Sequence, residues 1–208
     1  MLTGAADRLD ATGFEARYRA DPDPWSFHTS WYEQRRYDVS MAALPDARYR
    51  RALELGCANG ALTRRLATRC DELHGIDISP TAVDLAGRTC ADLDNVVLTV
   101  GAAPEDLPAG RFDLVVLSEV GYYFTVAGLA HLLDALAARL ADGGTLLSVH
   151  WTGVSADHVL AGSVVEAQVQ AHQAWRTTVR HTDEHFVLGV HVRVSASPGD
   201  AAAASGST

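Results

Sequence analysis

Two glycines and one aspartate have the residue types and the spacing that binding of a nucleoside requires. The stretch "ALELGCANGALT" begins as an apolar strand and then places Gly56 and Gly60 in a turn before a helical pattern. Asp77 follows seventeen positions after Gly60, at the end of the next apolar run. Glycines let a ligand approach the backbone, and a carboxylate at this place can accept both hydroxyls of a ribose. The alternative is that the glycines serve only strand-to-helix packing and that Asp77 is a solvated strand-end residue.

An open α/β sheet would bring these residues together, because ligands bind beyond the carboxyl ends of its strands. Strand and helix patterns alternate along the chain as such a sheet requires. Strands are expected over 52–55, 73–78, 96–100, 112–117 and 145–149, and helices over 61–70, 80–91 and 126–140. A helix over 157–172 and two alternating segments, 175–181 and 185–194, follow. The last two segments predict an antiparallel hairpin that closes the sheet.

Helix-start signals complete this outline. "TGFE" and "SWYE" match the capping box, so Thr12 and Ser30 are expected to start two short helices around an irregular "DPDPW" corner. Ser79 before Pro80 is a further start signal. We expect the segment 12–45 to be a lid on one domain that covers 1–194. The tail over 195–208 has almost nothing to bury and is expected to be disordered.

Composition excludes several classes of function. The 208 residues, 48% of them apolar, fit one compact domain. A net charge of -9 without a basic cluster argues against a nucleic-acid partner, and the absence of lysine excludes Schiff-base chemistry. No apolar run reaches the roughly 20 residues of a membrane helix, so we expect a soluble cytoplasmic protein without a membrane partner. Neither the three cysteines nor the nine histidines have metal-ligand spacing, so no metal is expected.

The glycine pattern decides which nucleoside is expected. The dinucleotide fingerprint G-x-G-x-x-G would need glycine where Ala58 and Ala61 stand. The pattern E-x-G-x-x-x-G, made by Glu54, Gly56 and Gly60, instead resembles the first motif of class I S-adenosylmethionine-dependent methyltransferases. "GAAPEDLP", "FDLVVLSEV" and "LADGGTLLSV" stand where later parts of that fold would lie. The resemblance implies a Rossmann-like fold with an open, mostly parallel seven-stranded sheet, and S-adenosyl-L-methionine as cofactor.

A narrower resemblance rests on four separated stretches. "DPDPWSF", "YEQRRY", "ALELGCANGALT" and "SEVGYYF" are together similar to the nodulation protein S (NodS) group of N-methyltransferases, over about 14–147. Members of this group methylate the free amine of a partly deacetylated amino-sugar oligomer. The resemblance implies N-methylation of a primary amine on a small, amino-sugar-type or other polar acceptor, which is the expected small-molecule partner. No pattern in the sequence indicates an oligomeric state.

The resemblance also assigns cofactor residues position by position. It implies that the loop holds the methionine portion, with Glu54 orienting it from beneath. Asp77 would hold the ribose, Ile78 would pack on the adenine, and Glu105 or Asp106 would accept from the adenine amino group. The residues of the methionine portion and the adenine edge are then Gly56, Ala58 and Gly60, and Ala102 and Ala103. Many class I enzymes carry an aspartate where this chain has Ala102.

Two N-terminal residues complete the implied cofactor site. Arg36 matches the family position that reaches the cofactor carboxylate, a role that suits a guanidinium because it pairs with carboxylates in a bidentate manner. Its alternative is an ordinary exposed helix arginine, with Arg35 facing inward instead. Trp25 would close over the site, or would only anchor the N-terminal helices to the core.

Candidate catalytic residues follow from the chemistry of methyl transfer. A protonated amine must lose a proton before it attacks, so a carboxylate or an imidazole near the methyl group would assist. Glu119 and His150 are expected to follow strands at the ligand-binding edge, and Tyr122 and Tyr123 to line the acceptor pocket. The plainer alternatives are that Glu119 binds only cofactor, that His150 is structural and that the tyrosines are core residues.

Three other functions remain open at this point. An O-methyltransferase acting on a small metabolite would share every motif described above. An NAD-dependent oxidoreductase would keep the turn and Asp77 but would need the missing glycines. A non-catalytic cofactor-binding subunit would keep the first motif without needing Glu119.

Overall fold

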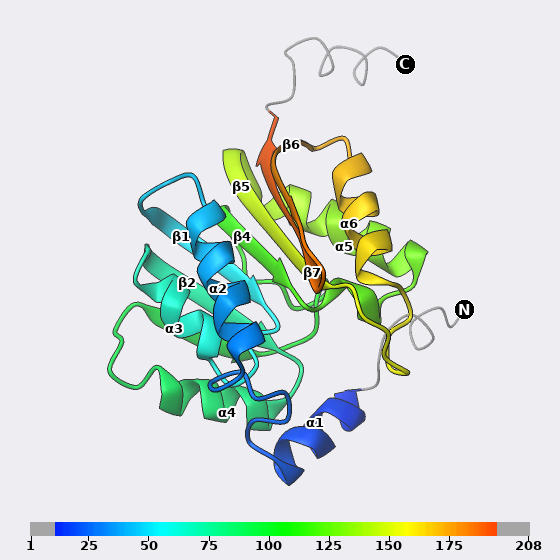
Figure 1. Cartoon of the computed structure of the whole chain (residues 1–208). Helices are drawn as coiled ribbons and strands as arrows, with labels where there is room; N and C mark the ends of the chain where they lie inside the picture. The colour runs from blue at the N-terminus through cyan, green and yellow to red at the C-terminus, as the bar shows by residue number, and fades with distance from the viewer. Residues whose placement is uncertain (1–10, 195–208) are drawn as a thin grey trace, which may run out of the picture.

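The structure of the chain is a computed structural model that describes residues 11–194, so the tail expected to be disordered lies outside the described residues. A seven-stranded sheet in the order β3-β2-β1-β4-β5-β7-β6 forms its centre (Figure 1). All neighbouring strands are parallel except β7, which runs antiparallel to both β5 and β6. The predicted fold class is confirmed. The strands are β1 Tyr49–Leu55, β2 Cys70–Asp77, β3 Val96–Val100, β4 Phe112–Ser118, β5 Leu140–Trp151, β6 Trp175–Thr182 and β7 Phe186–Arg193.

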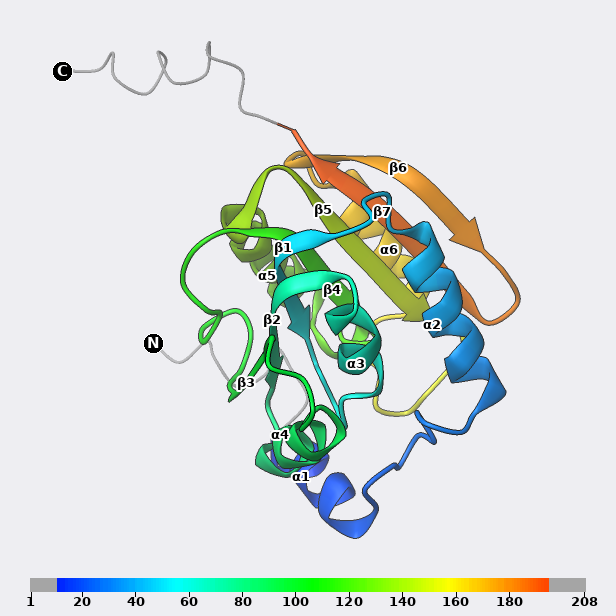
Figure 2. The same ribbon diagram turned by 90° about the vertical axis from the view of Figure 1, so that its left-hand side faces the viewer.

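Six α-helices and one short 3-10 helix are found in the described part of the chain. The core cluster on one face of the sheet includes residues of α5 and α6, and the cluster on the other face includes residues of α2 and α3 (Figures 1 and 2). The helices are α1 Ala11–Ala20, α2 Trp31–Ala43, α3 Ala61–Ala67, α4 Pro80–Thr89, η1 Gly121–Tyr123, α5 Val126–Arg139 and α6 Gly162–Ala171.

The central strands are apolar on both faces because helices cover both sides of the sheet. In β4, Leu114 and Val116 belong to the core beneath α2 and α3. Val115 and Leu117 belong to the core beneath α5 and α6. This double burial explains why the strands read as continuous apolar runs in the sequence, and why their positions could be predicted.

The chain changes direction across the sheet between β1 and β4. From β1 it proceeds through β2 to β3 on one side, whereas β4 and β5 lie on the other side. Leu55 at the end of β1 pairs with Leu117 at the end of β4, so the loops that follow these two strands are neighbours. In open α/β sheets, such a switch point is where ligands bind.

Several predicted boundaries were wrong. The helix expected over 157–172 begins only at Gly162, and β5 is seven residues longer than the strand expected over 145–149. Strand β5 begins earlier because Leu140 pairs with Phe112 of β4, and it ends later because β7 pairs with it as far as Trp151. His150 therefore lies within the strand instead of following it.

The two kinds of helix-start signal had different outcomes. Ser79 caps α4 as expected, since its Oγ atom accepts from the amide of Ala82 at 3.1 Å and Pro80 occupies the first turn. Ser30 precedes α2, but its side chain makes no capping hydrogen bond. The expected capping box fails because the Glu33 carboxylate pairs with Arg36 instead. Thr12 lies inside α1, which spans Ala11–Ala20.

Helix α1 is attached to the start of α4 through one carboxylate. Glu15 accepts from the Ser79 hydroxyl at 2.7 Å, and from the amide and the hydroxyl of Thr81 at 3.1 and 2.7 Å. These hydrogen bonds lower the pKa of Glu15 to about 2, with those from Ser79 contributing most. The carboxylate is therefore ionised at neutral pH and holds α1 beside the carboxyl end of β2.

Glu54, near the end of β1, has a pKa that is raised, whereas that of Glu15 is lowered. Only 2% of this residue is exposed, and burial raises the pKa of its carboxyl group to about 8. The side chain is therefore mostly protonated at neutral pH in the folded chain. In the unfolded chain it would titrate near its ordinary value of 4.5.

This difference predicts a pH-dependent stability that Glu54→Gln removes. Because the folded-state pKa is raised, the stabilising contribution of Glu54 is complete below about pH 4.5 and is lost as the pH rises through about 8. Urea unfolding of the unliganded protein should show Glu54→Gln gaining stability relative to the wild type between pH 5 and pH 8, by on the order of a few kcal/mol. Asp84→Asn, at an exposed position of α4, is the control and should show no such trend. A difference between Glu54→Gln and wild type that stays constant with pH would contradict the assignment.

Candidate functional site

Two adjoining cavities lie beyond the carboxyl ends of the central strands. The larger is lined by α1, the 25–27 segment, Glu33 of α2, the ends of β1 and β2, and the loops at 101–103 and 118–124. The smaller lies between α2, the start of α3 and the turn after β1. Both are lined by the same five residues where they meet, namely Phe27, Gly56, Ala58, Ser118 and Glu119.

Most of the residues proposed from the sequence line one of these cavities. Arg36 and Glu54 line the smaller cavity. Four candidates, Gly60, Glu105, Asp106 and His150, line neither of the two. The larger cavity is lined by Trp25, Gly56, Ala58, Asp77, Ile78, Ala102, Ala103, Glu119, Tyr122 and Tyr123.

Asp77 joins the turn after β1 to the end of β2. One carboxylate oxygen accepts from the amide of Ala58 at 3.0 Å, and the other accepts from the amide of Ser79 at 2.9 Å. Burial raises the pKa of Asp77, although these amide hydrogen bonds oppose the shift. Each oxygen keeps a second lone pair, so the carboxylate can still accept from a ligand in the cavity.

The turn itself is held in an uncommon backbone conformation. Gly56 has φ +70°, and Ala58, although it carries a side chain, has φ +52°. Such values disfavour residues other than glycine and cluster at functional sites. A Cβ atom on Gly56 would lie 2.5 Å from a side-chain atom of Val120, so glycine is needed for the turn to pass this close to the loop after β4.

Gly60 and the loop at 102–106 differ from what was expected. A Cβ atom on Gly60 would lie 2.9 Å from the Cα atom of Ala86, so this glycine permits α3 and α4 to pack closely. Glu105 is exposed, and the Ala102 amide donates to the Asp106 carboxylate at 2.9 Å. The Ala102 N–H and the Asp106 side chain, both proposed for adenine, are thus paired with each other within this loop.

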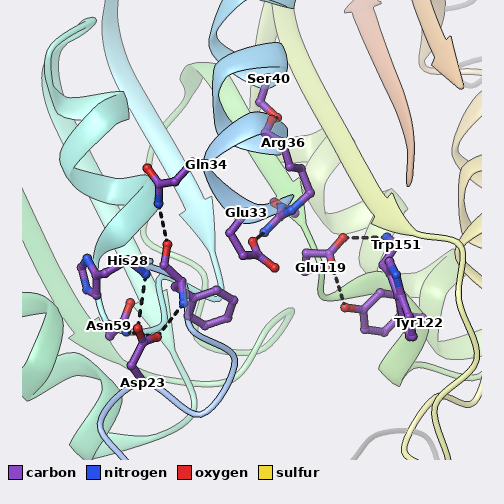
Figure 3. Close-up of polar contacts among 12 residues, drawn as sticks. Asp23, His28, Glu33, Gln34, Arg36, Ser40, Asn59, Glu119, Tyr122 and Trp151 are labelled. Atoms are coloured by element: carbon purple, nitrogen blue, oxygen red, sulfur yellow. Dashed lines mark hydrogen bonds and ion pairs between the residues drawn. The ribbon is translucent and has the colours of Figure 1, made fainter. Parts of the chain in front are cut away.

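Arg36 is the inward-facing arginine of α2. It is 2% exposed, donates to the Ser118 hydroxyl at 2.8 Å and forms an ion pair with Glu33 (Figure 3). Burial alone would lower its pKa, but the carboxylates of Glu119 and Glu33 more than offset this and raise the pKa. Arg35 instead faces outward to Asp183. The alternative in which Arg35 faces inward is therefore wrong.

Glu119 begins the loop after β4 and lies where the two cavities meet. Its backbone has φ +61°, an uncommon value for glutamate. One carboxylate oxygen accepts from the amide of Trp151 at 2.7 Å, and the other accepts from the Tyr122 hydroxyl at 2.9 Å (Figure 3). Burial raises the pKa of Glu119, while Arg36 opposes that shift. Two protein donors therefore fix the orientation of this carboxylate.

His150 does not reach either cavity. It is fully buried, and its Nε2 atom accepts from the amide of Gly121 at 3.3 Å. Burial lowers its pKa to about 4, so the imidazole is neutral at ordinary pH. These contacts place His150 beneath the loop that carries Tyr122, as a support. The expectation that it faces an acceptor from the end of a strand is not met.

Three buried polar atoms around the smaller cavity have no hydrogen-bond partner within residues 11–194. They are Nε of Arg36, Oε2 of Glu54 and Oδ1 of Asn59. An unpaired buried polar atom is costly, so such atoms indicate a polar ligand. The guanidinium suits a carboxylate, and the amide oxygen suits an ammonium group. The smaller cavity is therefore built for a ligand that carries both charges, such as the amino-acid end of a larger molecule.

The N-terminal corner is tied to the same turn. Asp23 accepts from the amides of Phe27 and His28 and from the side-chain amide of Asn59, the last at 2.9 Å (Figure 3). The Trp25 ring packs within 5.6 Å of both Tyr18 and Phe27. An aromatic wall on one side of the larger cavity is thus attached directly to the turn after β1.

Several site residues were missed in the sequence. Phe14 and Tyr18 line the larger cavity, and their spacing of four on a helix could have identified them as one face. Glu33 also lines it, and its spacing of three from Arg36 is the same kind of signal. The contact between Asn59 and Asp23 joins distant parts of the chain and leaves no local pattern.

Within the described residues, no group of three or more histidine, cysteine, aspartate or glutamate side chains is arranged to hold a metal ion. None of the helices in this part of the chain is long and apolar enough to span a membrane.

Solved structures share this architecture. A candidate methyltransferase from Pseudomonas syringae is 37% identical, with a TM-score of 0.71 over 79% of this chain and 100% of that chain. The N-methyltransferase NodS from Bradyrhizobium japonicum WM9, in complex with S-adenosyl-L-homocysteine, is 24% identical, with a TM-score of 0.79 over 89% of this chain and 98% of that chain. At 24% identity, the similarity to this NodS structure shows a shared fold only.

Sequence comparison points the same way. Nodulation protein S of Rhizobium tropici is 32% identical over 63% of this chain, and that of Sinorhizobium fredii is 29% identical over 78%. The matched parts span 56% and 71% of these two relatives. The family model for nodulation protein S (NodS) matches residues 14–151, which is more than half of the chain. The chain therefore belongs to the NodS family.

Proposed function

We propose that this chain is an S-adenosyl-L-methionine-dependent methyltransferase that methylates a primary amine on a small, polar, amino-sugar-type acceptor. The observation that carries the proposal is the meeting of two different cavities at Glu119. One cavity offers unpaired groups for an amino-acid end, and the other offers Asp77 for a ribose. Membership in the NodS family and the N-methyltransferase described among the similar structures support the same activity.

The residues present fit the cofactor. Arg36 and Asn59 would hold the carboxylate and the ammonium group of its methionine portion through their unpaired Nε and Oδ1 atoms. Asp77 would accept from the ribose, and Ile78 and Ala103 would line the adenine position. When bound, the cofactor supplies a methyl group on a sulfonium, which a lone pair of the acceptor attacks in line.

Glu119 is the residue that connects the two parts of the site. Its carboxylate lies at the junction of the cavities, where it favours a positively charged group. The Trp151 amide and the Tyr122 hydroxyl keep it in one orientation. An amine held beside this carboxylate would lie where the cavities meet, with water excluded by the aromatic lining.

We also propose that the segment 12–45 is a lid. Three of its contacts to the rest of the chain are the Glu15 hydrogen bonds to α4, the Asp23 hydrogen bond to Asn59 and the Arg36 hydrogen bond to Ser118. All three lie at the rim of the site. A ligand that adds further contacts to Arg36 would therefore stabilise the closed position of the lid.

One prediction of the proposed function concerns the hydrogen bonds between Asp77 and the ribose of the cofactor. Asp77→Asn keeps the shape of the side chain but removes its charge, and Asp77→Ala removes the acceptor entirely. Calorimetric titration with S-adenosylhomocysteine should show that Asp77→Ala weakens binding by about 2 kcal/mol or more, because charge-assisted hydrogen bonds are lost. Asp77→Asn should lie between Asp77→Ala and the wild type. Equal affinity in all three proteins would remove Asp77 from the cofactor site, and tighter binding of NAD than of S-adenosylhomocysteine would contradict the proposed class of enzyme.

The second prediction tests the reaction. Wild-type protein incubated with S-adenosylmethionine should add a methyl group to a primary amine such as glucosamine and not to glucose, as measured by mass spectrometry. Glu119→Gln should lower turnover by roughly 10²-fold or more, because the charge that favours the amine is lost. Asp84→Asn serves as the control for surface charge. Faster methylation of hydroxyl acceptors than of any amine would rule out the proposed acceptor class.

The third prediction concerns the lid. Limited proteolysis near residues 21–25 should be slower with saturating S-adenosylhomocysteine than without it. Asn59→Ala removes the hydrogen bond to Asp23 and should make the corner more sensitive in the unliganded protein. Cleavage at the same rate with and without ligand would show that this segment does not act as a lid.

A further inference from the structure

Glu33 is a buried carboxylate of the site that the cofactor contacts proposed above do not use. It is 6% exposed, lies in the first turn of α2 and lines the larger cavity. Its Oε2 atom accepts from Arg36. Figure 3 shows its other oxygen pointing away from Arg36, and no hydrogen bond to that oxygen is found within the described residues.

The two acidic side chains near Arg36 are held differently. Both oxygens of Glu119 accept from protein donors, the Trp151 amide and the Tyr122 hydroxyl. Glu33 has only its partner Arg36, which leaves one oxygen able to accept a hydrogen bond from a ligand in the cavity. Of the two carboxylates, Glu33 is therefore the one with an oxygen that no group in the described residues donates to.

The charge around the cavities favours a cation. Of the described residues that line either cavity, Arg36 is the only arginine, and no histidine lines them. Three acidic side chains, those of Glu33, Asp77 and Glu119, line the larger cavity, and Arg36 is the one basic side chain beside them. A site with more acidic than basic side chains attracts a positively charged ligand. Aromatic rings that line the same cavity, including those of Phe14 and Trp25, also favour a cation.

We propose that Glu33 binds the ammonium group of the acceptor and takes its proton. The free oxygen of Glu33 accepts one N–H of the ammonium group, that N–H bond breaks, and the proton passes to the carboxylate. The nitrogen keeps the electron pair and becomes the neutral nucleophile. After methylation the nitrogen is again cationic, and Glu33 returns its proton to solvent. This assignment rests on the proposed function, and it makes amines that are cationic in solution the preferred acceptors.

Two substitutions distinguish binding of the acceptor by Glu33 from a role in which Glu33 only holds Arg36 in position. Glu33→Gln keeps an oxygen that can accept from Arg36 but removes the negative charge. Glu33→Ala removes both. A residue that acted only by holding Arg36 would lower cofactor affinity most in Glu33→Ala, and neither variant would change the preference for amines over neutral acceptors.

The experiment measures binding and turnover with glucosamine as the probe. Calorimetric titration of glucosamine into the complex with S-adenosylhomocysteine should show binding weakened about tenfold or more in Glu33→Gln, because a charge-assisted hydrogen bond is lost. The affinity for S-adenosylhomocysteine itself should stay within about twofold of the wild type. In turnover assays, the acid limb of the pH profile should move in Glu33→Gln, and KM for glucosamine should rise.

The outcomes distinguish this inference from the proposed function. A wild-type protein that neither binds S-adenosylhomocysteine nor methylates any amine contradicts the proposed function. A wild-type protein that methylates amines, together with a Glu33→Gln variant of unchanged KM and pH profile, overturns the role of Glu33 alone. Loss of S-adenosylhomocysteine binding in Glu33→Gln also overturns it, because Glu33 would then act through Arg36.

Discussion

The arrangement of the site depends on one buried guanidinium. Arg36 connects α2 to the end of β4 through Ser118 and lies beside the ring of Tyr37, 4.9 Å from its centre. A buried arginine is tolerated only when it is paired, and the carboxylates of Glu33 and Glu119 supply the opposite charge. The position of α2, and with it the 21–28 corner, therefore follows from an electrostatic requirement at the centre of the sheet edge.

Acidic groups around this guanidinium differ in protonation because their surroundings differ. Glu54 has no cation beside it, so burial keeps it protonated at neutral pH. Burial also raises the pKa of Asp77, but amides of the turn and of the loop after β2 donate to its oxygens and oppose that effect. Glu119 has both a cation and two donors. Burial thus raises the pKa of all three carboxyl groups at this sheet edge, and their neighbours oppose that shift to different extents.

Much of the fold could be predicted from the sequence because its strongest signals are local. Continuous apolar runs gave the five parallel strands, and Ser79 with Pro80 gave the start of α4. Long-range contacts gave no such signal. Strand β5 extends to Trp151 only because β7 pairs with it, and the capping box at Ser30 fails only because Glu33 is needed by Arg36.

The candidate site was predictable to the extent that its residues follow strands. Asp77 and Glu119 end two strands of a parallel sheet, and both line the larger cavity. His150 was misjudged because the length of its strand is set by tertiary pairing. Asn59 was missed because its contact with Asp23 joins distant parts of the chain, and Glu33 was missed because it was interpreted as part of a capping box and not as the partner of Arg36.

Gly60 limits which substitutions a chain with this fold can accept during evolution. Its missing side chain lets the start of α3 lie against α4, while residues only two to four positions earlier line both cavities. A larger residue here would separate two helices and, through the same short turn, displace the backbone that faces the ligand. Changes in helix packing on this side of the sheet are thereby coupled to ligand recognition.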